Sequence, residues 1–277
     1  MKTFYKRFAR RKVSVIGLIV LIIFFIIAVF GPIISSQDPL EQNLINTYEL
    51  PSKEHWLGTD YLGRDTLSRM IYGARMSLTI SFSGVFQGAS IGVLLGVFAG
   101  YFGSWVDSLI SRFIDLLLAF PSLLLAITIV AVLGPGVKNT TIAIAIFSIP
   151  SIARITRGVV MSQKEEEYIH MAKVMAASSP RIIFTHIIPN AVSQIIVNIT
   201  LSLGTAILTA SSLSFLGLGV QAPQAEWGAM LSIGRNVLRS YPLAVFIPGI
   251  AITLVVMSFS LVGDGLRDAL DPRLKNR

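Results

Sequence analysis

The stretch from Lys164 to Pro189 has the side chains best suited to binding another molecule. It begins with three consecutive acids, Glu165 to Glu167, and continues with apolar residues at helical spacing. Charged pairs and apolar contacts are the chemistry that this mixture can provide. Because a simple link between two apolar runs needs only a few residues, this longer charged stretch is predicted to be a docking surface for a soluble protein.

Two helices separated by a break are predicted within this stretch. Residues Lys164–Met175 should form the first helix, and Ser178 begins the break. Ser179 can cap a second helix whose first residue is Pro180, and this helix continues through residues 181–188 into the next apolar run. One face of the first helix is expected to carry Tyr168, Met171, Ala172 and Met175.

An alternative for this stretch is an amphipathic hairpin that lies on the membrane without a partner. The three acids Glu165, Glu166 and Glu167 argue against it, since they would face an anionic leaflet. A protein partner accommodates these charges more easily.

Catalytic and metal-binding chemistry is not indicated. The histidines His55, His170 and His186 lie outside the apolar runs, where an intramembrane hydrolase would need its nucleophile, base or metal. The chain has no cysteine and therefore neither disulfides nor thiolate metal sites. It also lacks the Gly-x-x-x-x-Gly-Lys-Ser/Thr phosphate loop, so it is not expected to hydrolyse ATP itself. We predict no catalytic residue, metal ligand or cofactor in this chain.

The elements around the charged stretch must be membrane helices. The chain is 53% hydrophobic and 14% charged, whereas soluble proteins average about 25% charged residues. Segments of about 20 apolar residues can cross a bilayer, and they must be helical to satisfy their backbone groups. An all-α membrane protein is therefore predicted, with spans at 13–34, 77–102, 116–133, 139–160, 188–214 and 243–262. A cleaved signal peptide is the alternative for the first run, but its apolar part would be shorter than Val13–Ile34.

The distribution of Lys and Arg predicts the orientation. These residues are more frequent in 1–12, in the 154–186 loop and in 266–277 than in the connections on the other face. The positive-inside tendency therefore puts both termini and the 154–186 loop in the cytoplasm. The net charge of +8 is then mainly a topology signal, and no separate basic fold indicates nucleic-acid binding.

The extracytoplasmic segment 35–76 is expected to contain an amphipathic helix that lies on the bilayer before the second span. Its apolar residues recur at helical spacing, and Asp65 and Arg69 could pair on the polar side. The alternative is direct contact with a substrate's path. The apolar residues are Leu67, Met70, Ile71 and Ala74.

Internal prolines and the scarcity of charge bear on mechanism. Pro121, Pro150, Pro189 and Pro248 should kink their spans, either as hinges or as static bends.

The ionisable residues of the spans lie toward the cytoplasmic ends, where Arg112 and Asp115 could pair; the others are Arg154, Arg157 and Asp264. An ion-coupled secondary transporter usually has carboxylates or histidines at mid-membrane, so energy is expected to enter from elsewhere. A membrane scaffold or receptor would not need the elaborate loop.

The loop also resembles a known motif. Residues Glu167–Ser178, with Arg181–Ile183 and His186–Asn190, are similar to the EAA loop of ABC importer permeases. More narrowly, the chain resembles the C-type permease subunit of the dipeptide/oligopeptide/nickel family. Further blocks of resemblance are His55–Leu78, Asp107–Ser122, Leu213–Gly219 with Glu226–Leu231, and Gly263–Pro272.

Two positions depart from this family. Ala176 occupies the usual glycine position of the EAA turn, so the first helix of the loop is expected to continue further before it bends. Ser260 occupies the position of an asparagine. Both changes concern loop geometry and leave the resemblance intact.

The resemblance implies a type I importer permease fold in the bacterial cytoplasmic membrane, with a core at 77–265 and coupling helices at about 164–188. Its implied partners are a second homologous permease, two ATPases that bind ATP-Mg and an extracytoplasmic substrate-binding protein. In the ATPase contact, Glu167 would form a charged pair or helix-start contact. Tyr168 and Met171 would pack into a groove, while Ala172 and Ala176 would allow close approach, although both alanines could instead pack only within the loop. Arg181 completes the expected contact.

The substrate is expected to be a dipeptide or oligopeptide. Alternatives are nickel or another metal chelate, a glutathione-like solute, a glycopeptide and an oligosaccharide-like solute. Neutral polar side chains could line the path, although such residues more often form hydrogen bonds between helices. These candidates are Gln87, Ser122, Thr128, Asn190, Gln194, Asn198 and Thr205.

Overall fold

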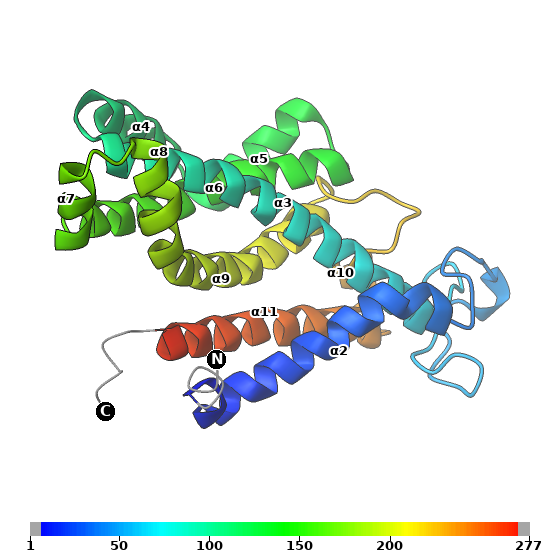
Figure 1. The fold of residues 1–277 in the computed structure, drawn as a ribbon. Coiled ribbons are helices and arrows are strands. Elements are labelled where there is room, and N and C mark those ends of the chain that lie inside the picture. Colours follow the sequence, from blue (N-terminus) through cyan, green and yellow to red (C-terminus); the bar gives the residue numbers. More distant parts are fainter. Residues whose placement is uncertain (1–6, 271–277) are drawn as a thin grey trace.

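A computed structural model describes residues 7–270, and every long element in it is a helix (Figure 1). Within these residues, five helices are long and apolar enough to cross a membrane. They confirm five of the predicted spans, each with somewhat different ends. These helices are α2 (Lys12–Ile34), α3 (Thr66–Phe102), α6 (Val137–Lys164), α9 (Ile188–Phe215) and α11 (Leu243–Leu270). The parts of the predicted basic tails at 1–6 and 271–277 lie outside the described residues.

The span predicted at 116–133 is not one straight helix. It consists of α4 (Ser104–Leu118) and α5 (Ser122–Leu133), which are bent by 88° relative to each other. Pro121 precedes the first residue of α5 in an extended conformation (ψ 130°), and its ring removes a backbone donor. The proline therefore separates two helices where the sequence predicted a kink within one.

The amphipathic helix expected before the second span is not a separate element. Residues 66–76 are the first turns of α3, which at 37 residues is roughly 55 Å long and exceeds a hydrocarbon core of roughly 30 Å. The predicted pair of Asp65 and Arg69 is also wrong. Asp65 caps α3 by accepting a hydrogen bond from Ser68 N at 2.7 Å, while buried Arg69 lies 3.2 Å from the Asp60 carboxylate.

The contact between α3 and α6 depends on five glycines spaced four residues apart along α3, which we call the glycine seam. A Cβ at Gly88 would lie 2.5 Å from the Ala145 carbonyl oxygen, and one at Gly96 would lie 2.6 Å from that of Ala153. Real Cβ atoms do not approach so closely, so the two backbones can meet only where side chains are missing. The members of the seam are Gly84, Gly88, Gly92, Gly96 and Gly100.

Two ion pairs hold α4 against α6. Arg154 Nη2 lies 2.6 Å from Asp115 Oδ1, and Arg157 Nη2 donates to Asp107 Oδ2 at the same distance. The predicted pair of Arg112 with Asp115 is therefore wrong. Neighbours three residues apart on α4 do not meet, because both carboxylates turn toward the arginines of α6.

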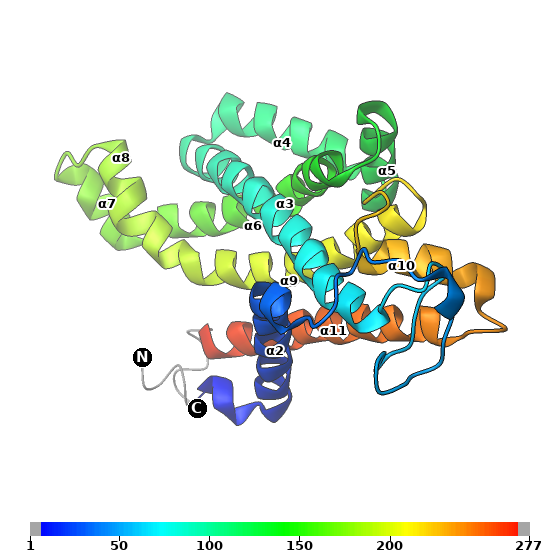
Figure 2. The same ribbon diagram turned by 90° about the vertical axis from the view of Figure 1, so that its right-hand side faces the viewer.

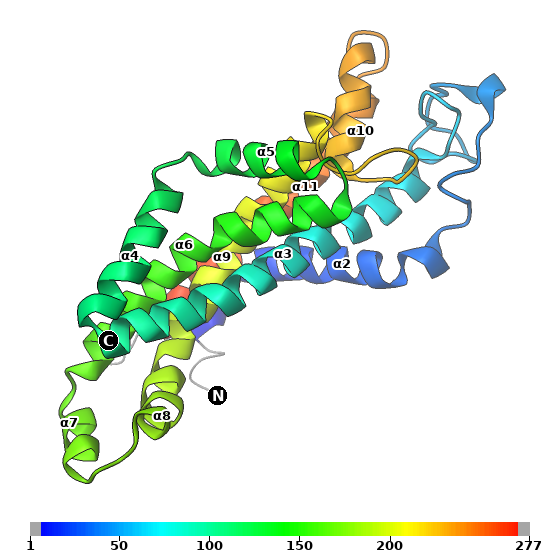
Figure 3. The ribbon, with the colours of Figure 1, turned by 90° about the horizontal axis from the view of Figure 1, so that it is seen from above.

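The two ends of the molecule differ in construction. The described chain ends and the short helices α7 (Glu167–Val174) and α8 (Ser179–Ile182) lie at one end; the 35–65 segment and α10 (Trp227–Gly234) lie at the other (Figures 1 and 3). At this second end, the Tyr241 hydroxyl donates to the Glu49 carbonyl at 2.8 Å. Burial raises the pKa of Tyr241, so the hydroxyl keeps the proton that this bond uses.

The first span packs across the last one and across α3 (Figure 2). Arg11, just before α2, donates to Asp268 near the end of α11 at 2.8 Å. A Cβ at Gly265 would lie 2.6 Å from the Ser14 Cβ, so these two helices also touch through a glycine. Much of the rest of α2 exposes apolar side chains, including Ile19 and Ile23.

Candidate functional site

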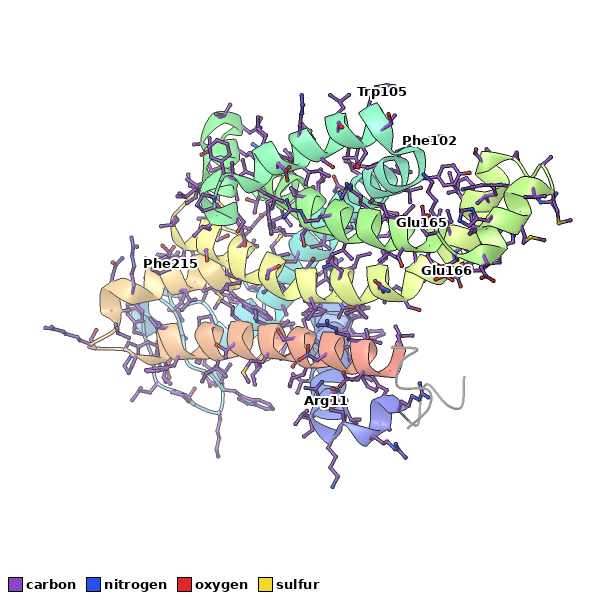
Figure 4. The ribbon with its side chains drawn as sticks, turned by 90° about the vertical axis from the view of Figure 1, so that its left-hand side faces the viewer. Arg11, Phe102, Trp105, Glu165, Glu166 and Phe215 are labelled. Atoms are coloured by element: carbon purple, nitrogen blue, oxygen red, sulfur yellow. The ribbon has the colours of Figure 1, made fainter. Side chains whose placement is uncertain are left out.

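The predicted docking stretch forms a hairpin of α7 and α8, which we call the α7–α8 hairpin. The expected helix Lys164–Met175 is interrupted at its start, because α6 ends at Lys164 and α7 begins at Glu167. Between them, Glu166 is extended (ψ 141°), and its carbonyl accepts the amide of Ile169 at 3.0 Å. Figure 4 shows Glu165 and Glu166 at this corner, where the chain leaves α6.

The turn after α7 corrects the expectation that α7 would continue beyond Ala176. Ala176 adopts a left-handed conformation, with φ of 58°. The Ala177 amide donates to the Ala172 carbonyl at 3.0 Å, and the Ala176 amide donates to the Lys173 carbonyl at 2.9 Å. This is the Schellman arrangement, which usually has glycine at the left-handed position. The alanine therefore makes the same turn at a cost in backbone strain.

The second helix begins one residue earlier than predicted. Ser178 occupies the N-cap position, and Pro180 lies in the first turn of α8. The chain then continues through a π-helical segment, Ile183–Ile187, into α9. The predicted continuity of this helix with the fifth span is thus confirmed, and the hairpin is joined to α6 on one side and α9 on the other.

The inner face of the hairpin packs against the ends of two spans. Ile169 and Ile187 are fully buried and Ile182 nearly so, and they contact Val97 of α3 and Val160 of α6. Ala172 is half-buried and packs against the same cluster. An apolar core of this kind fixes the position of the hairpin relative to the spans.

The outer face exposes apolar and acidic side chains together. Met171 is 61% exposed and Val174 is 81% exposed, although these are large apolar residues. Glu165, Glu166 and Glu167 are exposed too, and within residues 7–270 no base pairs with them. The face predicted from the sequence was centred on Tyr168 and did not include Val174. In the structure, the exposed face lies opposite the buried Ile169, and Val174 is part of it.

Tyr168 and Asn190 lie together at the base of the hairpin. Asn190 Nδ2 donates to the Tyr168 hydroxyl at 3.1 Å and to the His186 carbonyl at 2.8 Å. The Tyr168 hydroxyl in turn donates to Gln163 Oε1. Asn190 is one of the predicted candidates for the substrate path, and in the structure its amide links α9 to the hairpin. No local pattern could have indicated this contact, since it joins residues 22 positions apart.

The other predicted coupling residues, Ala176 and Arg181, are exposed on the hairpin, as is Met175 at the turn.

The remaining path candidates lie on three helices. Gln87 is exposed on α3, and Ser122 and Thr128 are exposed on α5, where the Thr128 hydroxyl donates to the Leu124 carbonyl. Gln194 and Thr205 are exposed on α9, whereas Asn198 is half-buried with its Oδ1 atom enclosed and unbonded. Within the described part of the chain, no hydrogen bond joins any two path candidates.

The arrangement is suited to binding rather than to bond chemistry. Among residues 7–270, no three His, Cys, Asp or Glu side chains come together as a metal site. What the hairpin offers is a rigidly seated surface, apolar at Met171 and Val174 and negative at its first turn. Such a surface fits a groove on another protein, as helix-in-groove contacts do.

Comparison with solved structures identifies the fold. A methionine ABC transporter in inward-facing conformations matches with a TM-score of 0.60 at 16% identity, covering 74% of this chain and 97% of that one. An amino acid ABC transporter with histidines matches with a TM-score of 0.56 at 18% identity, covering 72% and 92%. These likenesses confirm the ABC importer permease fold.

Sequence relatives cover almost the whole chain. The dipeptide transport system permease protein of Alkalihalophilus pseudofirmus is 50% identical over 98% of this chain and 90% of its own length. A di/tripeptide transport system permease protein of Pseudomonas aeruginosa is 44% identical, covering 100% and 93%. A glutathione transport system permease protein of Shigella flexneri is 46% identical, covering 98% and 90%.

Two family models match separate parts of the chain. Residues 1–51 match the N-terminal transmembrane domain of oligopeptide transport permease C, and residues 92–276 match the binding-protein-dependent transport system inner membrane component. The chain is thus a multi-pass inner membrane permease subunit and not itself an ATPase. It belongs to the family of binding-protein-dependent transport system inner membrane components.

Proposed function

We propose that this chain is one permease subunit of an ATP-driven importer of dipeptides or oligopeptides, and that the α7–α8 hairpin docks on an ABC ATPase. The observation that carries the docking proposal is the contrast between the two faces of the hairpin. Its inner face is buried against α3 and α6, whereas Met171 and Val174 are exposed opposite to it. Large apolar side chains that are exposed on a firmly packed helix indicate a protein contact.

The mechanism follows from how the hairpin is mounted. It is continuous with α9 and lies two residues beyond α6, so a displacement of the hairpin moves the ends of both spans. ATP binding would close the ATPase pair and carry the hairpin with it. The spans would then shift between inward-facing and outward-facing states, because the ATPase contacts favour one of them.

The assembly that fits this mechanism has four further components. A second homologous permease completes the pathway, two ATPase subunits bind ATP-Mg, and an extracytoplasmic binding protein delivers the substrate. The described ends of the chain and the hairpin lie at the same end of the molecule (Figure 1), and the excess of basic residues in the sequence supports a cytoplasmic location for that end.

Within the hairpin, the surface roles are best assigned to Glu167, Met171 and Arg181, which are exposed. Ala176 would allow close approach at the turn. Tyr168 has a mixed role, since its hydroxyl already bonds within the chain while the residue as a whole is 41% exposed. Ala172 contributes mainly to the seating of the hairpin.

The substrate class is supported by the relatives, which transport dipeptides, tripeptides or glutathione according to their names. Glutathione is itself a small peptide, so it is the second candidate. The neutral polar side chains of Gln87, Gln194 and Asn198 would suit a path for peptides whose own charges vary.

The docking proposal is tested by co-purification of the ATPases with this chain. Met171→Asp places a charge in the middle of the exposed apolar face and leaves the buried core unchanged, so the ATPases should be lost from the complex. Leu238→Asp is the matched control, because Leu238 is 46% exposed and comes four residues after α10, which lies at the opposite end of the molecule. Retention of the ATPases by Met171→Asp would show that the hairpin is not their docking site.

The substrate proposal has a separate test. ATP hydrolysis by the reconstituted complex should rise when the binding protein carries a dipeptide or oligopeptide. A response to glutathione alone would replace the first substrate class with the second, and a response to a nickel chelate alone would refute both.

A further inference from the structure

A groove of about 350 Å³ lies between α2 and α3, in the half of the molecule nearer the 35–65 segment. One wall is apolar and belongs mainly to α2, and the other contains a row of polar side chains from α3. The lining residues are Phe25, Ala28, Val29, Arg75, Leu78, Thr79, Phe82 and Ser83.

The polar row has unused bonding capacity. Arg75, Thr79 and Ser83 are spaced four residues apart and therefore share one side of α3. Within residues 7–270, Arg75 has no acidic partner and neither hydroxyl forms a hydrogen bond. Other hydroxyls of this helix do bond to the preceding turn, as Ser81 does to the Ser77 carbonyl at 2.9 Å.

The position of Arg75 favours an anionic partner. It lines the groove beside Val29, which is five residues before the end of α2 and so roughly 7.5 Å from that end. An arginine at this depth can extend its guanidinium to the headgroup level, where phosphates lie. An unpaired guanidinium left in hydrocarbon would be costly.

The apolar wall favours a lipid over a peptide. Phe25 and Val29 are 51% and 54% exposed, and the Phe25 and Phe82 rings meet at 5.6 Å to form a continuous apolar surface. A peptide zwitterion would also need an acceptor for its ammonium group, and no acidic residue lines the groove. An acyl chain needs no such acceptor.

We propose that this groove binds an anionic phospholipid from the leaflet nearer the 35–65 segment. The guanidinium of Arg75 holds the phosphate, and the Thr79 hydroxyl, one turn further along α3, donates to one of its oxygens. One acyl chain lies along Phe25, Val29 and Phe82. The site is separate from the path of the transported solute. Its lipid headgroup binds where α2 and α3 contact each other.

The test uses the purified transporter complex exchanged into micelles that contain phosphatidylglycerol and phosphatidylcholine. Native mass spectrometry counts the phosphatidylglycerol molecules that remain bound. Arg75→Gln should reduce retention of this lipid about tenfold, as expected for loss of one charge-assisted hydrogen bond. Arg239→Gln is the control, because Arg239 is exposed outside the groove and within the described residues has no ion-pair partner.

A second pair of variants fills the groove instead of removing its charge. Thr79→Phe should also reduce phosphatidylglycerol retention, while Ser90→Phe, on an exposed part of α3 outside the groove, should not. Equal retention by wild type, Arg75→Gln and Thr79→Phe would overturn the proposal. So would an Arg75→Gln complex that keeps its lipid but shows a raised KM for peptide uptake, since the groove would then belong to the substrate's path.

Discussion

The glycine seam and the α7–α8 hairpin both pack against α6, but they differ in what lies on their other sides. In the seam, every glycine meets α6 directly, and a Cβ at any of the five would lie 3.0 Å or less from a neighbouring atom. In the hairpin, only the inner face is packed, and the outer face carries exposed Met171 and Val174. The seam therefore makes α3 and α6 move as one unit. The hairpin, in contrast, is attached through its inner face and keeps its outer face exposed.

The largest effect should come from breaking the seam. Gly88→Val would push a branched side chain into the Ala145 carbonyl and the Ser148 side chain, at a cost of at least about 3 kcal/mol. Little folded protein should be recovered, as judged by size-exclusion chromatography in detergent. Gly158→Val is the control, because nothing lies within 4 Å of a Cβ at this glycine of α6. Equal recovery of the two variants would contradict the tight seam.

A smaller and more local effect is expected where the hairpin is seated. Ile169→Ala removes a fully buried side chain and should cost about 2–5 kcal/mol locally. The spans should remain folded while the amides of α7 exchange hydrogen faster, which hydrogen-exchange mass spectrometry measures. Val174→Ala, at an 81% exposed position, should leave exchange unchanged. Uniformly faster exchange in both variants would mean that the two faces of α7 do not differ.

The smallest effect should be a gain in stability. Ala176→Gly relieves a left-handed alanine and should stabilise the turn by about 1 kcal/mol. The hairpin amides should exchange more slowly. Ala177→Gly is the control and should speed exchange, because Ala177 is not among the residues with positive φ and a glycine there only loosens the chain. Faster exchange in Ala176→Gly would show that the left-handed turn carries no strain.

The sequence predicted the helices well because apolar length and backbone satisfaction leave few alternatives in a membrane. It also predicted two helices within the 164–188 stretch, where Glu167 and Met171, which we propose for docking, are exposed in the structure. Local patterns were enough for both results. The four-residue spacing of Gly84, Gly88 and Gly92 was visible as well, and it could have indicated a close helix contact.

The errors concern choices between local and distant partners. Asp115 had Arg112 nearby on the same helix, yet it pairs with Arg154, 39 residues away. Arg69 likewise pairs with Asp60 rather than with Asp65. Spacing shows which side chains could meet on one helix, but tertiary packing decides which pairs form. At Ala176, propensity favoured continuation of the helix, and the packing of Ala172 and Ala177 against the spans instead required a turn.

The contact between the first and last spans has a consequence for biosynthesis. Arg11 is made 257 residues before its partner Asp268, and Ser14 is likewise made long before Gly265, which it touches. Until α11 has been made, α2 must therefore reside in the bilayer as a single span without this contact. Its long apolar sequence allows that. Insertion can proceed helix by helix, but the bundle closes only when synthesis of α11 is complete.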